Sequence, residues 1–321
     1  MSEPGSQRVE TVAAAETIRG IVDNLGRVVH APDETLRLCV LCLVGEGHLI
    51  LEDFPGVGKT MLAKALARSL DVSFSRMQFT PDLLPSDVTG VNVFNQRSNE
   101  FEFRPGPVFA NLLLVDEINR ASPKTQAALL ECMQEQQVTT DGVTNELDRP
   151  FMVMATQNPI EYEGTYPLPE AQLDRFTMRI AIGYPPLAEE AKMLTEQTAD
   201  PPLDALQPVA NAADAIALAD EAKAIFVEES LNRYVVALLR ATRGDSRLYL
   251  GASPRAGIAL LRVAKARALA DGRSFLEPDD VKAVAVPVLA HRLILAPEAR
   301  STGVSGEQIV QETLDKTPVP V

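Results

Sequence analysis

The sequence has no apolar run long enough to cross a membrane. Its longest such run, Leu38 to Gly45, is far shorter than the ~20 residues that a membrane-spanning helix requires. The stretch Met1 to Glu10 is polar and contains no apolar segment of the kind found in secretory signals. We therefore expect a soluble protein without a membrane span, located in the cytoplasm.

Cysteine is also scarce, and three cysteines do not build a disulfide framework. Cys39 and Cys42 form a Cys-x-x-Cys pair, but they lie in an apolar helical run and no second ligand pair accompanies them. Cys132 is remote in sequence. We interpret all three as buried thiols rather than as a zinc or redox site. The histidines are scattered as well, and we assign no metal to His30, His48 or His291.

Positive charge is in deficit. The chain has 30 Lys and Arg against 44 Asp and Glu, which gives a net charge of −14. Such a balance disfavours a protein that grips nucleic acid over a broad surface. The stretch from Arg233 to Arg273 is the main locally basic one, and we interpret its cations as lying on solvated helix faces and at subunit contacts.

A glycine-rich loop, Asp53 to Thr60, stands between a predicted strand at 48–52 and a predicted helix at about 58–70. Backbone N–H groups at a helix N-terminus bind phosphate, and Gly56 and Gly58 let the backbone approach it closely. Lys59 brings a positive charge to the β- and γ-phosphates, and the Thr60 hydroxyl is a ligand for Mg²⁺. The pattern predicts an ATP site, with an ordinary strand-turn-helix as the alternative. One departure is Asp53, which stands where such loops usually open with glycine.

The chain has 321 residues. Up to about residue 183, predicted strands alternate with predicted helices. This alternation indicates a parallel α/β sheet. Within it, residues 80–110 are predicted to form an inserted hairpin, and the Asp141-Gly142 pair predicts a second one at about 136–150. Composition then becomes rich in Ala, Leu, Glu and Arg. We predict a core domain at 1–185 and a helical domain at 186–321, with a flexible tail after about Pro297.

An apolar run at residues 112–115 ends in two acids, Asp116 and Glu117. Continuous hydrophobicity of this kind predicts a strand buried on both faces of a parallel sheet. Phosphoryl transfer depends on positioning and charge neutralisation. Asp116 is therefore predicted to hold Mg²⁺ directly or through water, and Glu117 to polarise the attacking water. Acids that merely cap a strand are the alternative, which the nearby phosphate loop disfavours.

Asn158 follows another predicted strand, residues 151–155. The carboxyl ends of parallel strands lie along the ligand-binding edge of a sheet. Asn158 is thus a candidate for contact with the γ-phosphate or with the attacking water. Formation of a turn before Pro159 explains the residue equally well, and both interpretations stay open.

Two arginines are candidates for stabilising charge during phosphoryl transfer. Arg175 precedes the last predicted strand of the core, too far round the domain to serve its own nucleotide, so we expect it to complete a neighbour's site. An ion pair with Asp174 is the alternative. Arg255 follows Ser253-Pro254, a predicted helix start, and could reach nucleotide from the helical domain. A solvent-exposed arginine of the first turn is the alternative there.

The sequence resembles the MoxR group of AAA+ ATPases, of the helix-2-insert clade, over about residues 15–300. The Gln78–Gly90 block does most to separate this group from its relatives. The resemblance is carried by Gly47–Glu52, Gln78–Gly90, Asp116–Ala121, Ala155–Pro159, Pro167–Phe176 and Ser253–Arg255.

The resemblance implies a three-layer αβα core with a parallel five-stranded sheet and inserted hairpins, followed by a smaller all-α lid domain. It implies ATP hydrolysis with Mg²⁺ held by Thr60 and Asp116. Catalytic roles fall to Lys59, Glu117, Asn158 and Arg175, the last as an arginine finger. The implied nucleotide contacts are Pro55, Gly56, Val57, Gly58, Lys59, Thr60, Met61, Asp116 and Arg255.

Members of the group form oligomers, usually hexameric rings, and act as chaperone-like remodelers. Typical partners contain von Willebrand factor A domains. The resemblance therefore implies a homo-oligomer that remodels or matures such a partner, metal-cofactor insertion included. A nucleic-acid motor or loader, a non-hydrolysing nucleotide switch and the motor subunit of a metal chelatase stay open as alternatives. The segment Val28–Asp33 departs from the usual Val-Gly-Gln stretch, which leaves the contacts to adenine open.

Overall fold

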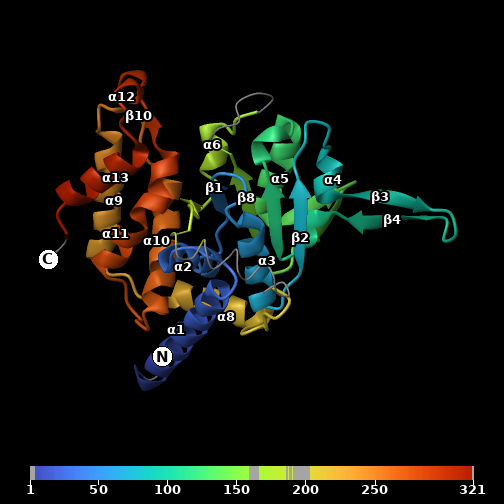
Figure 1. Cartoon of the computed structure of the whole chain (residues 1–321), viewed down its shortest axis with the longest axis horizontal. Coiled ribbons are helices and arrows are strands. Elements are labelled where there is room, and N and C mark those ends of the chain that lie inside the picture. Colours follow the sequence, from blue (N-terminus) through green and yellow to red (C-terminus); the bar gives the residue numbers. More distant parts are fainter. Residues whose placement is uncertain (1–3, 159–165, 186, 188–189, 191–202, 320–321) are drawn as a thin grey trace.

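The computed structural model describes the whole chain except residues 1–3, 159–165, 186, 188–189, 191–202 and 320–321. A sheet with helices on both faces is followed by a bundle of helices (Figure 1). One hairpin projects from the sheet on the side opposite that bundle. No helix in the described part of the chain is long and apolar enough to span a membrane. The predicted domain boundary at 185/186 adjoins undescribed residues and stays a prediction.

A five-stranded parallel sheet forms the centre of the first part, in the order β2-β5-β8-β1-β9. Every residue of the apolar run in β5 is buried, as expected for a strand covered on both faces. Gln78 at the end of β2 pairs in register with Asp116 at the end of β5, so the carboxyl ends of these strands meet at one edge. The strands are β1 (Leu49–Glu52), β2 (Phe74–Gln78), β5 (Leu112–Asp116), β8 (Met152–Gln157) and β9 (Met178–Ile180).

Successive residues of the central strands face two different cores. In β5, Leu112 and Leu114 pack into one cluster, whereas Leu113 and Val115 pack into the other. Helices α1, α2 and α3 contribute to the first cluster and α5 to the second. This confirms the three-layer αβα core. The helices of this part are α1 (Pro4–Gly26), α2 (Asp33–Val44), α3 (Lys59–Ser69), α4 (Pro85–Thr89), α5 (Pro123–Glu135) and α6 (Glu170–Leu173), with short 3-10 turns η1 (Pro107–Phe109) and η2 (Ile118–Arg120).

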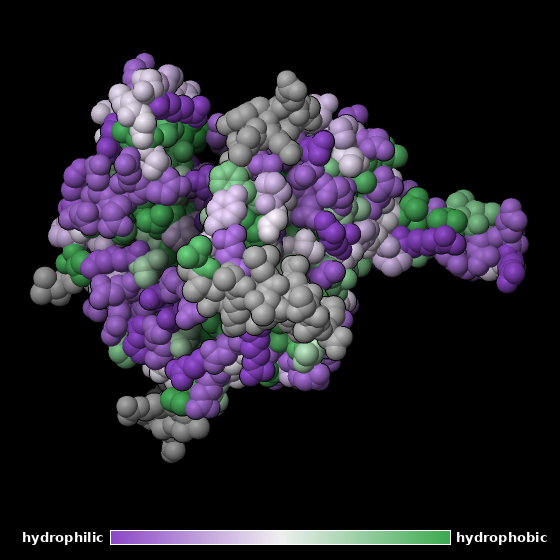
Figure 2. Space-filling model, viewed as in Figure 1, coloured by the Kyte–Doolittle hydropathy of each residue, from purple (hydrophilic) through white to green (hydrophobic). Residues whose placement is uncertain are grey.

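Both predicted hairpins are present. The first consists of β3 (Gly90–Asn95) and β4 (Glu100–Pro105), and the second of β6 (Gln137–Thr140) and β7 (Val143–Glu146). Asp141 and Gly142 join the latter with positive φ angles of 52° and 80°, the conformation that favours Asp-Gly in tight turns. On the projecting hairpin Phe94 and Phe101 lie opposite each other, exposed, with ring centroids 5.3 Å apart. Figure 2 shows hydrophobic surface along one edge of this hairpin.

The second part of the chain is helical. Its central helix, α10, packs against α1 and α2 of the first part as well as against α8 and α11, so one apolar core runs through both parts. The elements are α8 (Ala212–Ala224), α9 (Glu229–Arg243), β10 (Leu248–Leu250), α10 (Pro254–Ala270), α11 (Pro278–Leu289), η3 (Ala290–Arg292), β11 (Ile294–Leu295), α12 (Pro297–Ser301) and α13 (Gly306–Lys316).

The end of the chain differs from the predicted flexible tail. Helix α13 begins at a capping box in which the Ser305 hydroxyl accepts from the Gln308 N–H at 3.2 Å. Ile309 and Val310 are fully buried against α9 and α11. The prediction was wrong because the apolar residues in this stretch recur at helical spacing and complete the core of the bundle.

All three cysteines are buried, as the sequence indicates. Cys39 and Cys42 occupy apolar positions of α2, and Cys132 lies in α5. Burial raises the pKa of the Cys39 and Cys132 thiols to about 12, so both are inert at neutral pH.

His48 is buried between β8 and α5. Its Nδ1 accepts a hydrogen bond from the Val153 N–H at 3.0 Å, so its Nε2 donates to the Met133 carbonyl, also at 3.0 Å. These two bonds hold the neutral ring. Burial lowers the pKa of His48 from 6.5 to about 4.

We expect the free energy of unfolding to decrease as the pH falls from about 6.5 to about 4, because the unfolded chain then binds a proton at His48 and the folded chain does not. This contribution is complete above the unfolded pKa and is lost toward the folded pKa, by about 3 kcal/mol. Urea unfolding across this pH range measures it. His48→Gln should make the dependence shallower, with the remaining slope due to His291, whose pKa burial also lowers. His30→Gln should retain the slope of the parent chain. Equal pH slopes for His48→Gln and the parent chain would contradict the assignment.

Candidate active site

The phosphate loop needs glycine for its backbone conformation. Gly56 and Gly58 have φ angles of +87° and +96°, in the left-handed region that other residues rarely adopt. A Cβ added at either position would meet no atom within 4 Å. The space beside the loop is therefore open to a ligand.

Helix α3 starts at Lys59, directly after the loop. Its first turn contains no acidic residue, and no side chain caps its N–H groups. Such an end attracts anions. The Lys59 Nζ donates to the Asp53 carbonyl at 2.5 Å. Burial lowers the pKa of Lys59, while the carboxylates of Asp53, Asp116 and Glu117 oppose this shift.

The loop and the ends of three strands enclose a cavity of about 380 Å³. Val57 does not line it and packs against the core instead. The cavity brings together nine of the residues that the sequence selected: Pro55, Gly56, Gly58, Lys59, Thr60, Met61, Asp116, Glu117 and Asn158.

The two acids at the end of β5 both face this cavity. Asp116 is 8% exposed, and its Oδ1 accepts from the Thr156 hydroxyl at 3.4 Å. The same hydroxyl accepts from the Glu117 N–H at 2.9 Å. Glu117 has a positive φ of 56°, a strained conformation for a residue other than glycine. Both acids line the same cavity.

Three partners of these acids were missed by reasoning from the sequence. The Arg76 Nε lies 2.7 Å from Asp116 Oδ2. Glu117 Oε2 accepts from Gln78 Nε2 at 2.6 Å and from Arg120 Nη1 at 2.8 Å. A signal was available, because Arg76 and Gln78 are polar residues two apart, a spacing that places them on one face of a strand.

The hydrogen bonds of the Asp53 side chain account for an aspartate at the start of the loop. Its side chain is buried, and Oδ1 accepts from the Phe54 N–H at 2.9 Å. Oδ2 accepts from the backbone N–H groups of Ile182 and Gly183, both at 2.7 Å. Next to these bonds, the Phe54 and Tyr184 rings stack with centroids 5.6 Å apart. Asp53 thus ties the phosphate loop to the segment that follows β9.

Arg175 and Arg255 lie away from the phosphate loop and line a second cavity, of about 420 Å³. Within the described part of the chain, neither guanidinium has a hydrogen bond or an ion pair. The ion pair considered for Arg175 is made by another arginine, because Asp174 Oδ1 accepts from Arg292 Nε at 2.7 Å. The structure thus groups the two candidate arginines but separates them from the other candidates.

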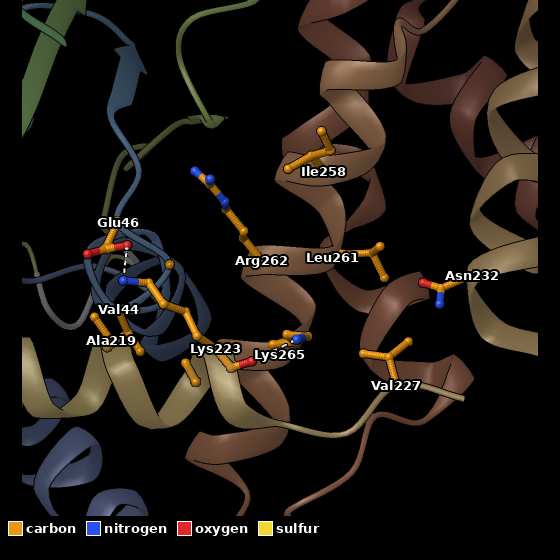
Figure 3. A pocket seen from close by; sticks show the side chains of 12 residues that line it. Val44, Glu46, Ala219, Lys223, Val227, Asn232, Ile258, Leu261, Arg262 and Lys265 are labelled. Atoms are coloured by element: carbon orange, nitrogen blue, oxygen red, sulfur yellow. Dashed lines mark hydrogen bonds and ion pairs between the residues drawn. The ribbon is translucent and has the colours of Figure 1, made fainter. Parts of the chain in front are cut away.

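A third cavity, of about 380 Å³, adjoins the second one along α10 (Figure 3). Its lining is largely apolar, and the two cavities share Glu46, Ile258 and Arg262. Figure 3 shows Lys223 reaching Glu46, an ion pair of 2.7 Å. The exposed face of α10 therefore presents both cationic and apolar side chains.

The donor set at the loop suits a nucleotide and Mg²⁺. The described residues contain no group of three or more His, Cys, Asp or Glu side chains that could hold a metal by themselves. Mg²⁺ in nucleotide sites takes one or two protein ligands, with phosphate and water supplying the others. Thr60 and Asp116 in one cavity fit that requirement.

Comparisons with known proteins agree with this arrangement. The family model of the ATPase family associated with various cellular activities (AAA) matches residues 48–178, and that of the AAA lid domain matches 240–313. YeaC of Bacillus subtilis is 49% identical over 94% of each chain. Chaperone MoxR1 of Mycobacterium tuberculosis is 40% identical over 96% of this chain and 84% of its own. A crystal structure of a presumed ATPase from Cytophaga hutchinsonii superposes with a TM-score of 0.92, at 40% identity, over 99% of each chain.

Proposed function

Because this chain belongs to the MoxR-type AAA+ ATPases, we propose that it hydrolyses ATP with Mg²⁺ at sites shared between neighbouring copies in a ring. By the family resemblance the ring is a hexamer. Hydrolysis drives the remodelling or maturation of a partner protein, in the manner of a chaperone.

The separation of the catalytic groups carries this proposal. Lys59 and Glu117 line one cavity, Arg175 and Arg255 line another, and the two cavities have no lining residue in common. Two guanidinium groups without an anionic partner among the described residues are an unusual arrangement in a chain with a net charge of −14. An arginine supplied from a neighbour is a common way to stabilise the charge that develops on a transferring phosphoryl group. The triphosphate of an adjacent copy is the anion that suits both arginines.

Different residues around the loop bind the phosphates, hold Mg²⁺ and activate the attacking water. Lys59 and the first N–H groups of α3 bind the β- and γ-phosphates. Thr60 and Asp116 would hold Mg²⁺, which neutralises phosphate charge when bound. Glu117 takes a proton from the attacking water, and Asn158 orients that water.

The basic stretch of the helical part supports a protein partner over nucleic acid, because several of its cations are already paired. Arg247 contacts Asp245 at 2.7 Å and Glu312 at 3.0 Å. Arg273 contacts Asp280 at 2.6 Å. Cations held this way are poorly placed to neutralise phosphates of a nucleic acid.

A protein with a von Willebrand factor A domain is the partner we propose. Its support is the family resemblance, together with the chaperone named among the relatives. Insertion of a metal cofactor into that partner is one form the maturation can take.

Partner capture on the assembled Glu117→Gln chain tests this function. Held with ATP and Mg²⁺, the variant should retain a protein that contains such a domain, because the ATP state persists without hydrolysis. The same capture without nucleotide is the control. Recovery of nucleic acid, together with ATPase activity stimulated by it, would refute the proposal in favour of a nucleic-acid motor.

A further inference from the structure

Arg76 lines the nucleotide cavity and pairs with Asp116, the acid expected to hold Mg²⁺. We propose that Arg76 is a cation of the protein that pairs with Oδ2 of Asp116 and is displaced from it when Mg²⁺ binds. Arg76 thereby sets the Mg²⁺ concentration at which nucleotide is bound. This inference rests on the proposed function.

The contacts of Asp116 leave its Oδ2 as the oxygen at which Mg²⁺ can replace Arg76. Its Oδ1 faces the Thr156 hydroxyl, and its Oδ2 lies 2.7 Å from Arg76 Nε. The carboxylate is 11% exposed, so an uncompensated charge there would be costly. Arg76 supplies the compensating charge. A guanidinium on this oxygen repels a second cation, and the two therefore compete for it.

The exposure of Arg76 makes the exchange possible. Its side chain is 52% exposed, and β2 holds it at the edge of the sheet rather than in the core. Ion pairs with such an exposed partner are weak. A divalent ion that arrives with a nucleotide therefore overcomes the pair, while the pair still shifts the concentration at which it does so.

The neighbouring acid has its own cation. Glu117 contacts Arg120 at 2.8 Å, and Arg120 comes from the turn η2 rather than from β2. Each acid of the pair is thus matched with a different arginine. Arg120 and Arg76 carry the same charge, and each pairs with one of two adjacent acids. Arg120 therefore provides a matched comparison that separates competition at Asp116 from a general effect of charge.

Replacement of Arg76 by Mg²⁺ also affects how the end of β2 is held. Arg76 and Gln78 both belong to β2, and both contact an acid at the end of β5. The chain leaves β2 for α4 and then for the projecting hairpin β3–β4. Release of Arg76 removes one of the two side-chain bonds that hold the end of β2 to the acids.

Binding of a fluorescent ADP analogue to the full chain, titrated with Mg²⁺, tests the proposal. Arg76→Gln removes the charge and keeps a polar side chain, and its Mg²⁺ midpoint should be about fivefold lower than that of the parent chain, which is the effect of losing one weak ion pair. Arg76→Lys keeps the cation and should restore a midpoint near that of the parent. Arg120→Gln and the hairpin variant Arg97→Gln should leave the midpoint unchanged.

A midpoint for Arg76→Gln that equals or exceeds that of the parent would overturn the proposal. So would an equal decrease in Arg120→Gln, which would indicate charge in general. Thermal melting confirms that each variant is folded before titration. If the parent chain itself binds no nucleotide, the proposed function fails, and this outcome is distinct from a failure of the role of Arg76.

Discussion

Replacing Glu117 by glutamine should leave a chain that binds ATP as the parent does and hydrolyses it at least about 10²-fold more slowly. Glutamine retains the size of the side chain and one oxygen to accept from Gln78 and Arg120. It cannot take a proton from the attacking water. Lys59 and the loop are untouched, so the affinity for nucleotide is preserved. Equilibrium binding and single-turnover hydrolysis on the assembled protein separate the two effects.

Lys59→Ala is the companion variant for this measurement. It removes the cation at the start of α3 and should lose nucleotide binding itself. A turnover rate in Glu117→Gln comparable to that of the parent would rule out the water-activating role.

Arg175→Ala should reduce turnover by about 10³-fold in the assembled protein while leaving nucleotide affinity nearly unchanged. The reason is its location, since Arg175 lines a cavity that is separate from the one around its own phosphate loop. Its guanidinium makes no hydrogen bond or ion pair among the described residues, so its loss should cost little stability. Steady-state ATPase assays and thermal melting measure both expectations.

Mixing two inactive variants makes the test specific for a shared site. Arg175→Ala subunits keep an intact loop, and Lys59→Ala subunits keep an intact arginine. An interface that combines these two is complete, so an equal mixture should recover up to about a quarter of the parent activity. A mixture with no recovered activity, despite shared assembly, would place Arg175 at its own chain's nucleotide.

Much of the fold and part of the site could be predicted from the sequence because the signals are local. The apolar run in β5 indicates a central parallel strand, and it is fully buried. Asp116 at the end of β5 faces the loop because the carboxyl ends of parallel strands lie at one edge of the sheet. Gly56 and Gly58 mark a backbone conformation that few other residues adopt. Asn158 follows β8 at the same edge, as the order of the strands requires.

Other features depend on contacts between distant segments, which local patterns do not contain. Arg76 was overlooked because its partner lies 40 positions away and only the register of β2 with β5 joins them. Arg292 and Asp174 are 118 positions apart, so the true partner of Asp174 was invisible in its own neighbourhood. Helix α13 was mistaken for a tail because its buried face is defined only by the bundle that it completes.

The bonds of Asp53 have a consequence for how the two parts of the molecule move. One carboxylate accepts from the loop at Phe54 and from the chain at Ile182 and Gly183, where it leaves the sheet toward the helical part. A loop that opened with glycine would have no such side chain, and the two segments could shift independently. Here both segments are bonded to one carboxylate. We therefore expect the phosphate loop and the segment that follows β9 to move together.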